Sequence, residues 1–167
     1  MAGKEFDLGP TGRTVAENIR RLRGSTSYAE LSRWLADRKR FIPPLGLRRI
    51  EAGERRVDVD ELLALALIFD VNPNALLFPP ADDETEYEPT GAGRGQSLER
   101  VWDWADGRRP FWRDDEHGIT SFVLHARPPG RQFPGTDTDL TVEHLQELAR
   151  TLENMTKQLG KRSDGDD

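Results

Sequence analysis

The sequence contains no cysteine, which excludes disulfide bonds, thiolate-bound metals and iron–sulfur clusters. It also lacks an apolar run long enough to cross a membrane and a basic, then apolar leader. We therefore expect a chain of the reducing cytoplasm that has no membrane partner. Apolar residues are scarce, at 35% of the chain against 32% charged residues, so the core is expected to be modest and part of the chain unburied.

Histidines are also few, and none falls in a pattern typical of a site. His117, His125 and His144 lack the spacing of a zinc-binding pair on a helix. Ser121 lies close to His125, but no third member of a catalytic triad can be named. We expect no enzymatic activity, no metal and no cofactor.

The net charge of −6 conceals an uneven distribution. Between Arg13 and Arg56 there are twelve Arg and Lys against five Asp and Glu, whereas from Asp82 onward there are eleven against nineteen. A basic N-terminal part beside an acidic remainder favours phosphate binding on one side of the protein. Two domains with ordinary solvated surfaces would give the same distribution.

The N-terminal part carries three helix-start signals. Thr14, Ser27 and Asp58 each precede a Glu by three residues, the capping-box spacing. The first helix is expected to begin at Thr14 and to end at Gly24, and the second to end near Arg38. Each signal thus predicts a separate helix.

Two further helices complete this part. Proline is favoured at the first helical position, so a short helix is predicted over residues 44–52. The strongly apolar helix over residues 59–70 is expected to be buried on most of its surface, and a last short helix follows Asn72 and Pro73. Five helices with short connections predict an all-α bundle over residues 1–80.

The remainder of the chain is predicted to be less regular. Residues 81–97 are rich in Asp and Glu, then in Gly, and are interpreted as a linker. Residues 98–133 are expected to form a small α+β unit, with one helix from Leu98 and two strands over residues 111–113 and 119–126.

A C-terminal helix is predicted over residues 140–160. Its apolar residues recur at spacings of three and four, the pattern of a two-stranded seam. This seam would pair with a second copy of the chain or lie on the middle unit, and we expect a homodimer. The dimerisation candidates are Leu145, Leu148, Leu152, Met155 and Leu159.

Residues 14–78 resemble the Cro and lambda-repressor type of helix-turn-helix, the XRE family. The most specific matching element is Ile50-Glu51-Ala52-Gly53. The resemblance implies a mainly α protein with a five-helix lambda-repressor-like DNA-binding domain, followed by the small α+β unit and the C-terminal helix. It also implies a transcriptional regulator that acts on double-stranded DNA at the nucleoid. The matching segments are residues 19–23, 28–32, 47–53, 62–71 and 72–77.

The chain departs from the family in two places. Residues 36–41 form a longer turn than the family's. The positions of the recognition helix that usually carry small polar or amide side chains hold Pro43, Pro44, Leu45 and Gly46. This departure removes the usual polar side chains from the start of the helix.

The recognition helix, residues 44–52, is expected to enter the major groove with its N-terminus first. Leu45, Arg48 and Arg49 are the candidates for base contact. Alternatively, Arg48 and Arg49 would form ion pairs on the surface of the protein itself. Glu51 is expected to have a structural role and not to contact DNA. The phosphate-contact candidates are Arg13, Arg33, Arg38, Lys39, Arg40, Arg55 and Arg56.

Two alternatives remain open at this point. The chain would be a protein-interaction module, comparable to an antitoxin or an adaptor, if the aromatic residues Trp102, Trp104, Phe111 and Trp112 bound an unknown protein. The segment from Trp102 to Phe122 would otherwise form a pocket for a small-molecule effector that modulates DNA binding. Tryptophan is more often a core residue than a pocket residue, and we expect Trp34 to lie in the core.

Overall fold

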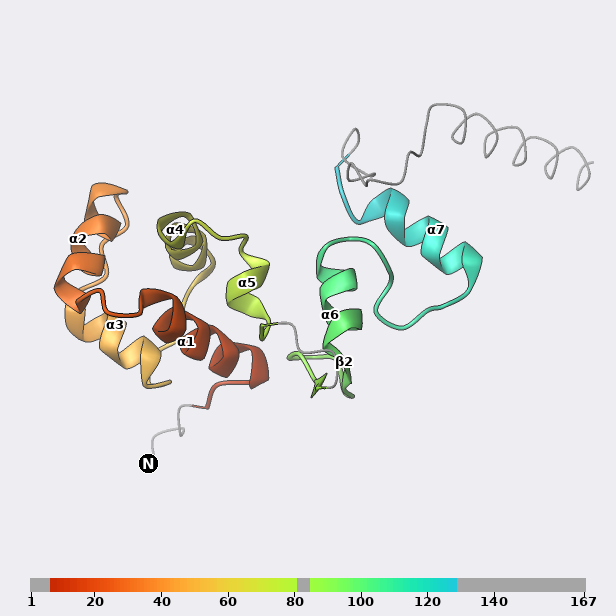
Figure 1. The fold of residues 1–167 in the computed structure, drawn as a ribbon, viewed down its shortest axis with the longest axis horizontal. Coiled ribbons are helices and arrows are strands. Elements are labelled where there is room, and N and C mark those ends of the chain that lie inside the picture. The colour runs from red at the N-terminus through yellow and green to blue at the C-terminus, as the bar shows by residue number, and fades with distance from the viewer. Residues whose placement is uncertain (1–6, 81–84, 129–167) are drawn as a thin grey trace, which may run out of the picture. The chain divides into compact units, whose positions relative to one another are not determined.

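The computed structural model describes residues 7–80 and 85–128. The chain divides into two compact units, residues 1–123 and 124–167, and the fold described below is that of the first. Its described residues are mainly helical, with a two-stranded antiparallel sheet (Figure 1). No helix in this described part is long and apolar enough to span a membrane.

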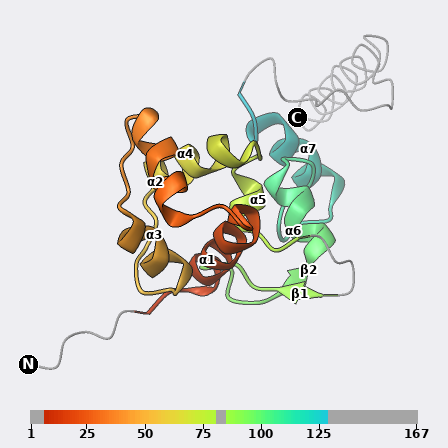
Figure 2. The same ribbon diagram turned by 60° about the vertical axis from the view of Figure 1, so that its left-hand side comes forward.

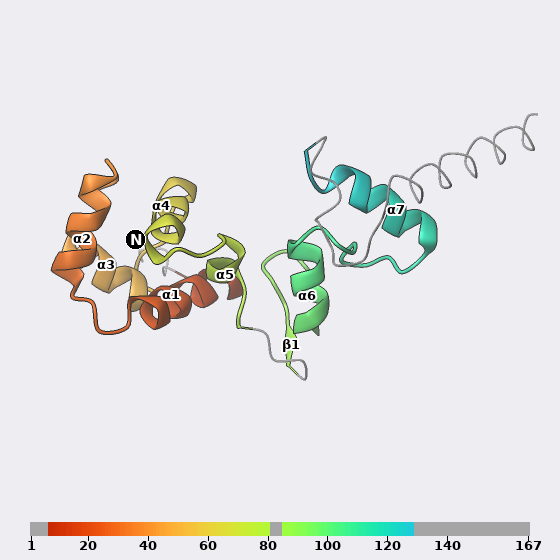
Figure 3. The same ribbon diagram turned by 45° about the horizontal axis from the view of Figure 1, so that its top comes forward.

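Five helices form the N-terminal bundle. α2 and α3 lie side by side at one end of it in two views (Figures 1 and 3). Among these five helices, none covers the outer side of α3. The five are α1 (Pro10–Arg23), α2 (Tyr28–Asp37), α3 (Pro44–Glu51), α4 (Val59–Phe69) and α5 (Asn74–Leu77).

Two of the three predicted helix starts are confirmed. The Ser27 side chain accepts a hydrogen bond from the backbone N–H of Glu30 at the start of α2. Asp58 and Glu61 form a complete capping box at the start of α4. Gly24 ends α1, as expected, with a φ of 55°.

The predicted start of the first helix at Thr14 is wrong. α1 begins at Pro10, and Gly9 occupies the N-cap position without a side-chain cap. Proline stabilises this start because its φ fits the first helical position, where its missing N–H needs no partner. The Thr14 hydroxyl instead donates to the Pro10 carbonyl and lies 2.9 Å from the Tyr87 hydroxyl.

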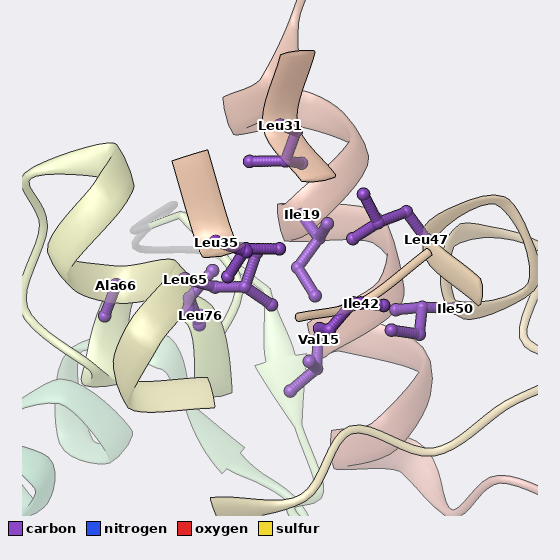
Figure 4. Packing of buried hydrophobic residues seen from close by; sticks show 10 residues of the cluster. All are labelled: Val15, Ile19, Leu31, Leu35, Ile42, Leu47, Ile50, Leu65, Ala66 and Leu76. Carbon is purple, nitrogen blue, oxygen red and sulfur yellow. The ribbon is translucent and has the colours of Figure 1, made fainter. Parts of the chain in front are cut away.

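The core of the bundle lies between all five helices. Figure 4 shows apolar side chains of the five helices pointing toward one another, joined by Ile42 from the segment before α3. Most of them are shielded completely from solvent. This core positions α3, since the inner face of α3 contributes Leu47 and Ile50. The cluster comprises Val15, Ile19, Leu31, Leu35, Ile42, Leu47, Ile50, Leu65, Ala66 and Leu76.

α4 does not have most of its surface buried, in contrast to the expectation from its apolar sequence. Its buried residues are Glu61, Leu65 and Ala66, whereas Leu63 and Leu67 on its other side are exposed. α4 contacts α1, α2 and α5. In so small a bundle the neighbours cover only one face of this helix, whatever its composition.

The strands predicted over residues 111–113 and 119–126 are wrong. Residues 111–113 form no strand, and α7 (Glu116–His125) is helical. Periodicity alone does not distinguish helix from strand in a short apolar run. The Asp115 side chain stabilises the start of this helix, because it accepts a hydrogen bond from the Gly118 N–H at 2.7 Å, as an N-cap does.

The two-stranded sheet lies within the segment that the sequence predicts to be a linker. β1 (Glu86–Tyr87) pairs antiparallel with β2 (Gln96–Ser97), with Glu86 opposite Ser97. α6 (Leu98–Ala105) follows directly and confirms the helix predicted from Leu98. Both strands lie beside α6 (Figure 2).

An aromatic cluster joins this region to α5. Phe78, directly after α5, meets the rings of Tyr87, Trp102 and Trp104 edge to face. The Trp102 indole N–H donates to the Pro79 carbonyl at 2.9 Å. α6 therefore packs against the helical bundle instead of forming a unit apart from it.

Candidate nucleic-acid interface

The C-terminal end of α3 is held by a nearly buried carboxylate. Glu51, whose side chain is 3% exposed, accepts hydrogen bonds from Arg23 Nε at 2.6 Å and Nη2 at 2.9 Å. The Tyr28 hydroxyl donates to the same carboxylate at 2.8 Å, and this bond raises the pKa of Tyr28. Because Arg23 ends α1 and Tyr28 begins α2, Glu51 fixes α3 to both helices.

Gly53 forms the turn that follows α3. Its φ of +74° lies in the left-handed region, which glycine adopts without strain. In this turn the Gly53 N–H donates to the Ile50 carbonyl at 3.0 Å, and the Glu54 N–H donates to the Arg49 carbonyl at 2.8 Å. The Glu-x-Gly spacing is thus explained by an interhelical ion pair and a helix C-terminus.

The N-terminal end of α3 is anchored through Ile42. The buried Ser32 hydroxyl on α2 donates to the Ile42 carbonyl at 2.7 Å, and the Ile42 side chain lies in the core. A Cβ at Gly46 would lie 3.1 Å from Ile42 Cγ2, so this close approach favours glycine. Both ends of α3 are therefore held in place by other parts of the bundle.

The three base-contact candidates lie on the exposed side of α3. Gly46, Leu47 and Ile50 are buried, whereas Leu45, Arg48 and Arg49 are exposed. Within residues 7–80 and 85–128, the structure gives no ion pair or hydrogen bond to the guanidinium of Arg48 or Arg49. The alternative that these arginines pair on the protein's own surface therefore finds no partner in this part of the chain.

Four of the seven phosphate-contact candidates have partners within the protein. Arg40 forms ion pairs with Asp58 and Asp60, and Arg55 binds both carboxylate oxygens of Glu61, at 2.6 and 3.0 Å. Such pairing reduces the charge that they offer to phosphate. Arg13 pairs with Asp7 at 3.3 Å, and Arg56 donates to the Asp7 carbonyl.

The other three candidates are exposed and carry no ion pair in the described part of the chain. Arg33 belongs to α2, and Arg38 and Lys39 belong to the turn that follows it. Arg38 makes only a local hydrogen bond, to the Trp34 carbonyl at 3.4 Å. The structure thus gathers Arg33, Arg38, Lys39, Arg48 and Arg49 on α2, the turn and α3.

The end of α2 and the turn that follows it expose two aromatic side chains. Lys39 has a φ of 58°, a left-handed conformation that ends α2. Its backbone N–H donates to the Ala36 carbonyl, and the Arg40 N–H donates to the Leu35 carbonyl. Phe41 is 67% exposed. Trp34, expected in the core, is 36% exposed, because the core-facing positions of α2 are taken by Leu31 and Leu35. No pattern in the sequence indicates these exposures.

The aromatic residues of the C-terminal region line one small cavity. It measures about 330 Å³ and is bounded by Trp104, Phe111 and Trp112 together with residues 89–92. Trp102, which the sequence analysis placed at one end of an effector pocket, lies instead in the aromatic cluster. The Arg94 guanidinium stacks on the Trp112 ring at 4.5 Å.

Several predictions concern other parts of the protein. No group of three or more His, Asp or Glu that could hold a metal occurs in the residues described. The dimerisation candidates Leu145, Leu148, Leu152, Met155 and Leu159 lie outside those residues. The predicted seam therefore stays a prediction.

Comparison of the chain with family models, curated proteins and solved structures finds no match.

Proposed function

We propose that the chain is a sequence-specific DNA-binding transcriptional regulator that places α3 in the major groove. The observation that carries this proposal is the exposed pair Arg48 and Arg49. The chain has 30 acidic residues against 24 basic ones, and it pairs Arg23, Arg40 and Arg55 with carboxylates. An arginine pair that has no such partner among residues 7–80 and 85–128 favours an external anion.

The exposed cationic residues are assigned to two kinds of DNA contact, one to bases and one to phosphates. Arginine binds guanine O6 and N7 with two parallel hydrogen bonds, the commonest specific contact in the major groove. Arg48 and Arg49 are assigned this role, and Arg49 is the stronger candidate because it matches a base-contacting position of the family. Arg33, Arg38 and Lys39 are assigned to phosphates, which position the protein without specifying sequence.

The order of the helices supports the same function. In helix-turn-helix proteins, the second helix of the motif lies in the groove while the first crosses the backbone. α2 and α3 adjoin here, and Ser32, Ile42 and Glu51 fix α3 relative to its neighbours. We assign residues 10–77 to the lambda-repressor-like fold on this arrangement and on the sequence resemblance.

We further propose that the protein acts as a homodimer through residues 145–159. Two copies would present two α3 helices to half-sites about one helical turn apart, 34–36 Å. The bound DNA is therefore expected to be a two-fold symmetric site.

Selection from a pool of random duplexes tests the proposal directly. The full chain is expected to enrich a symmetric motif that contains guanine in each half, and the double variant Arg48→Ala/Arg49→Ala is expected to lose the enrichment. Arg20→Ala is the control, because Arg20 is also exposed but lies on α1. Failure to enrich any motif at low salt would contradict the proposal.

One observation favours a second candidate, a protein-interaction module. Phe41, Leu45 and Trp112 are large apolar side chains exposed to solvent, and association with another protein would remove their apolar surface from water. A stable complex with another protein purified from cells, together with no enriched motif, would favour this candidate over DNA binding.

A further inference from the structure

The first turn of α3 is apolar although it is exposed. Pro43 is the N-cap, and Pro44 and Leu45 are the first two helical residues. All three are exposed, and the Leu45 side chain is 57% accessible to solvent. We call these three residues the apolar first turn.

The apolar first turn has almost no hydrogen-bonding capacity. None of its side chains carries a donor or an acceptor, and neither proline has a backbone N–H. Gly46, the next residue, has no side chain and is buried. A groove contact made by the side chains at this end of α3 is therefore apolar.

The surroundings of the apolar first turn are strongly cationic. Arg48 and Arg49 follow on the same helix, and Arg38 and Lys39 lie in the preceding turn, all exposed and without an ion pair among the described residues. The complementary surface must combine negative charge with isolated apolar groups. The major groove has this combination, since rows of phosphates flank the C5-methyl groups of thymine.

We propose that the apolar first turn contacts thymine methyl groups in the major groove, so that methyl recognition and guanine recognition share one helix face. The inference rests on the proposed function and names the chemistry of the site in the DNA. Leu45 lies three residues before Arg48 and four residues before Arg49. Residues at this spacing are about 5–6 Å apart at Cβ, and bases on one strand are about 3.4 Å apart. The contacted thymine therefore lies one or two steps from the contacted guanine.

Replacement of thymine by deoxyuridine isolates this contact, because it removes the methyl group and leaves the hydrogen-bonding edge of the base unchanged. Each thymine of the selected site is replaced in turn, and the Kd of the full chain is measured by fluorescence anisotropy. Burial of a methyl group contributes about 0.8 kcal/mol, equivalent to about a fourfold change in Kd. At least one replacement beside the guanine is expected to weaken binding by this factor.

The variant Leu45→Ala links the effect to the protein. It is expected to bind the thymine site about fourfold more weakly and to show no further loss on the deoxyuridine site. Val59→Ala is the control, because Val59 at the start of α4 is an apolar residue that is 82% exposed and does not line the hollow beside Arg38 and Lys39. This control is expected to keep both the affinity and the deoxyuridine effect, and circular dichroism checks that both variants are folded.

The outcomes separate the two proposals. If the full chain selects a motif but no deoxyuridine changes its Kd by more than about twofold, methyl recognition is wrong and DNA binding stands. An undiminished deoxyuridine effect in Leu45→Ala also overturns the assignment of the contact to this residue. If the full chain binds no duplex, both proposals fail.

Discussion

At the scale of a single residue, Glu51 connects α1, α2 and α3 through one carboxylate. Removal of one partner from a nearly buried ion pair leaves the other charge uncompensated. Glu51→Ala is therefore expected to lower the free energy of unfolding by about 3 kcal/mol, measured by urea denaturation. The double variant Arg23→Ala/Glu51→Ala is expected to lose less than the sum of the single variants. Additive losses would contradict the coupling.

Arg49 and Lys39 are predicted to affect DNA binding differently. Arg49→Ala is expected to weaken the selected site by about 1–3 kcal/mol and to relax specificity at one position, because a base contact is lost. Lys39→Ala is expected to weaken binding to all duplexes alike. It is also expected to reduce the salt slope, which is the slope of the logarithm of the binding constant against the logarithm of the salt concentration, by about one, because one phosphate contact is lost. Binding isotherms at several salt concentrations distinguish the two patterns. A sequence-dependent effect of Lys39→Ala would contradict its assignment.

The exposed residues of α3 were predictable from the sequence, whereas the ion pairs of other arginines were not. Leu47 and Ile50 recur at helical spacing, so Leu45, Arg48 and Arg49 fall on the opposite side. Arg40 pairs with Asp58 and Asp60 across the bundle. No periodicity indicates this contact, because it depends on the fold.

At the scale of elements, the start of α4 depends on the ionised Asp58 side chain. The backbone N–H of Glu61, and to a lesser extent Arg40, hold the pKa of Asp58 below its usual value of 3.8. This stabilisation is present above the pKa of the unfolded chain and is lost as the pH falls through the lower pKa of the folded protein. The melting temperature is therefore expected to fall on acidification below about pH 4.

Two variants isolate the titration of Asp58 from its capping role. Asp58→Asn keeps a good N-cap but removes the titrating group, so its melting temperature is expected to depend less on pH between about 2 and 5. Asp58→Ala is expected to lower the melting temperature at pH 7 as well, because it removes the N-cap of α4. An unchanged acid profile in Asp58→Asn would show that Asp58 does not supply this dependence.

Helix identity was easier to predict than helix ends and short strands. The starts of α2 and α4 followed from Ser27 and Asp58, since both caps are local in sequence. The start of α1 is not predicted by the capping-box spacing of Thr14, because the helix begins at Pro10, which is favoured at the first helical position. The apolar residues of α7 predict a strand, whereas the structure shows a helix whose capping residue, Asp115, is the local signal for it.

The whole molecule is expected to depend on contacts between the bundle and α6. Phe78 is 5% exposed because Tyr87, Trp102 and Trp104 cover it. A chain of residues 1–80 loses this cover, and its free energy of unfolding is expected to fall by about 1.5–3 kcal/mol relative to the full chain. Denaturation followed by far-UV circular dichroism measures the difference. Equal stability would show that the bundle does not need α6.

Oligomeric state is the second property at this scale. Leu148→Glu/Leu152→Glu in the full chain is expected to halve the mass found by sedimentation equilibrium, because charges in an apolar seam oppose pairing. The salt slope of DNA binding is expected to fall with it, since fewer phosphates are contacted by one copy. An unchanged dimer mass would exclude residues 145–159 as the dimerisation seam.

The two consecutive prolines at the start of α3 have a consequence for any binding partner. Their rings fix φ, which is −64° at Pro43, so this end of the helix keeps its shape in the free protein. Little backbone conformational entropy is then lost there on association. The ordering penalty falls instead on the long side chains of Arg48 and Arg49, and a partner meets a pre-organised backbone at each encounter.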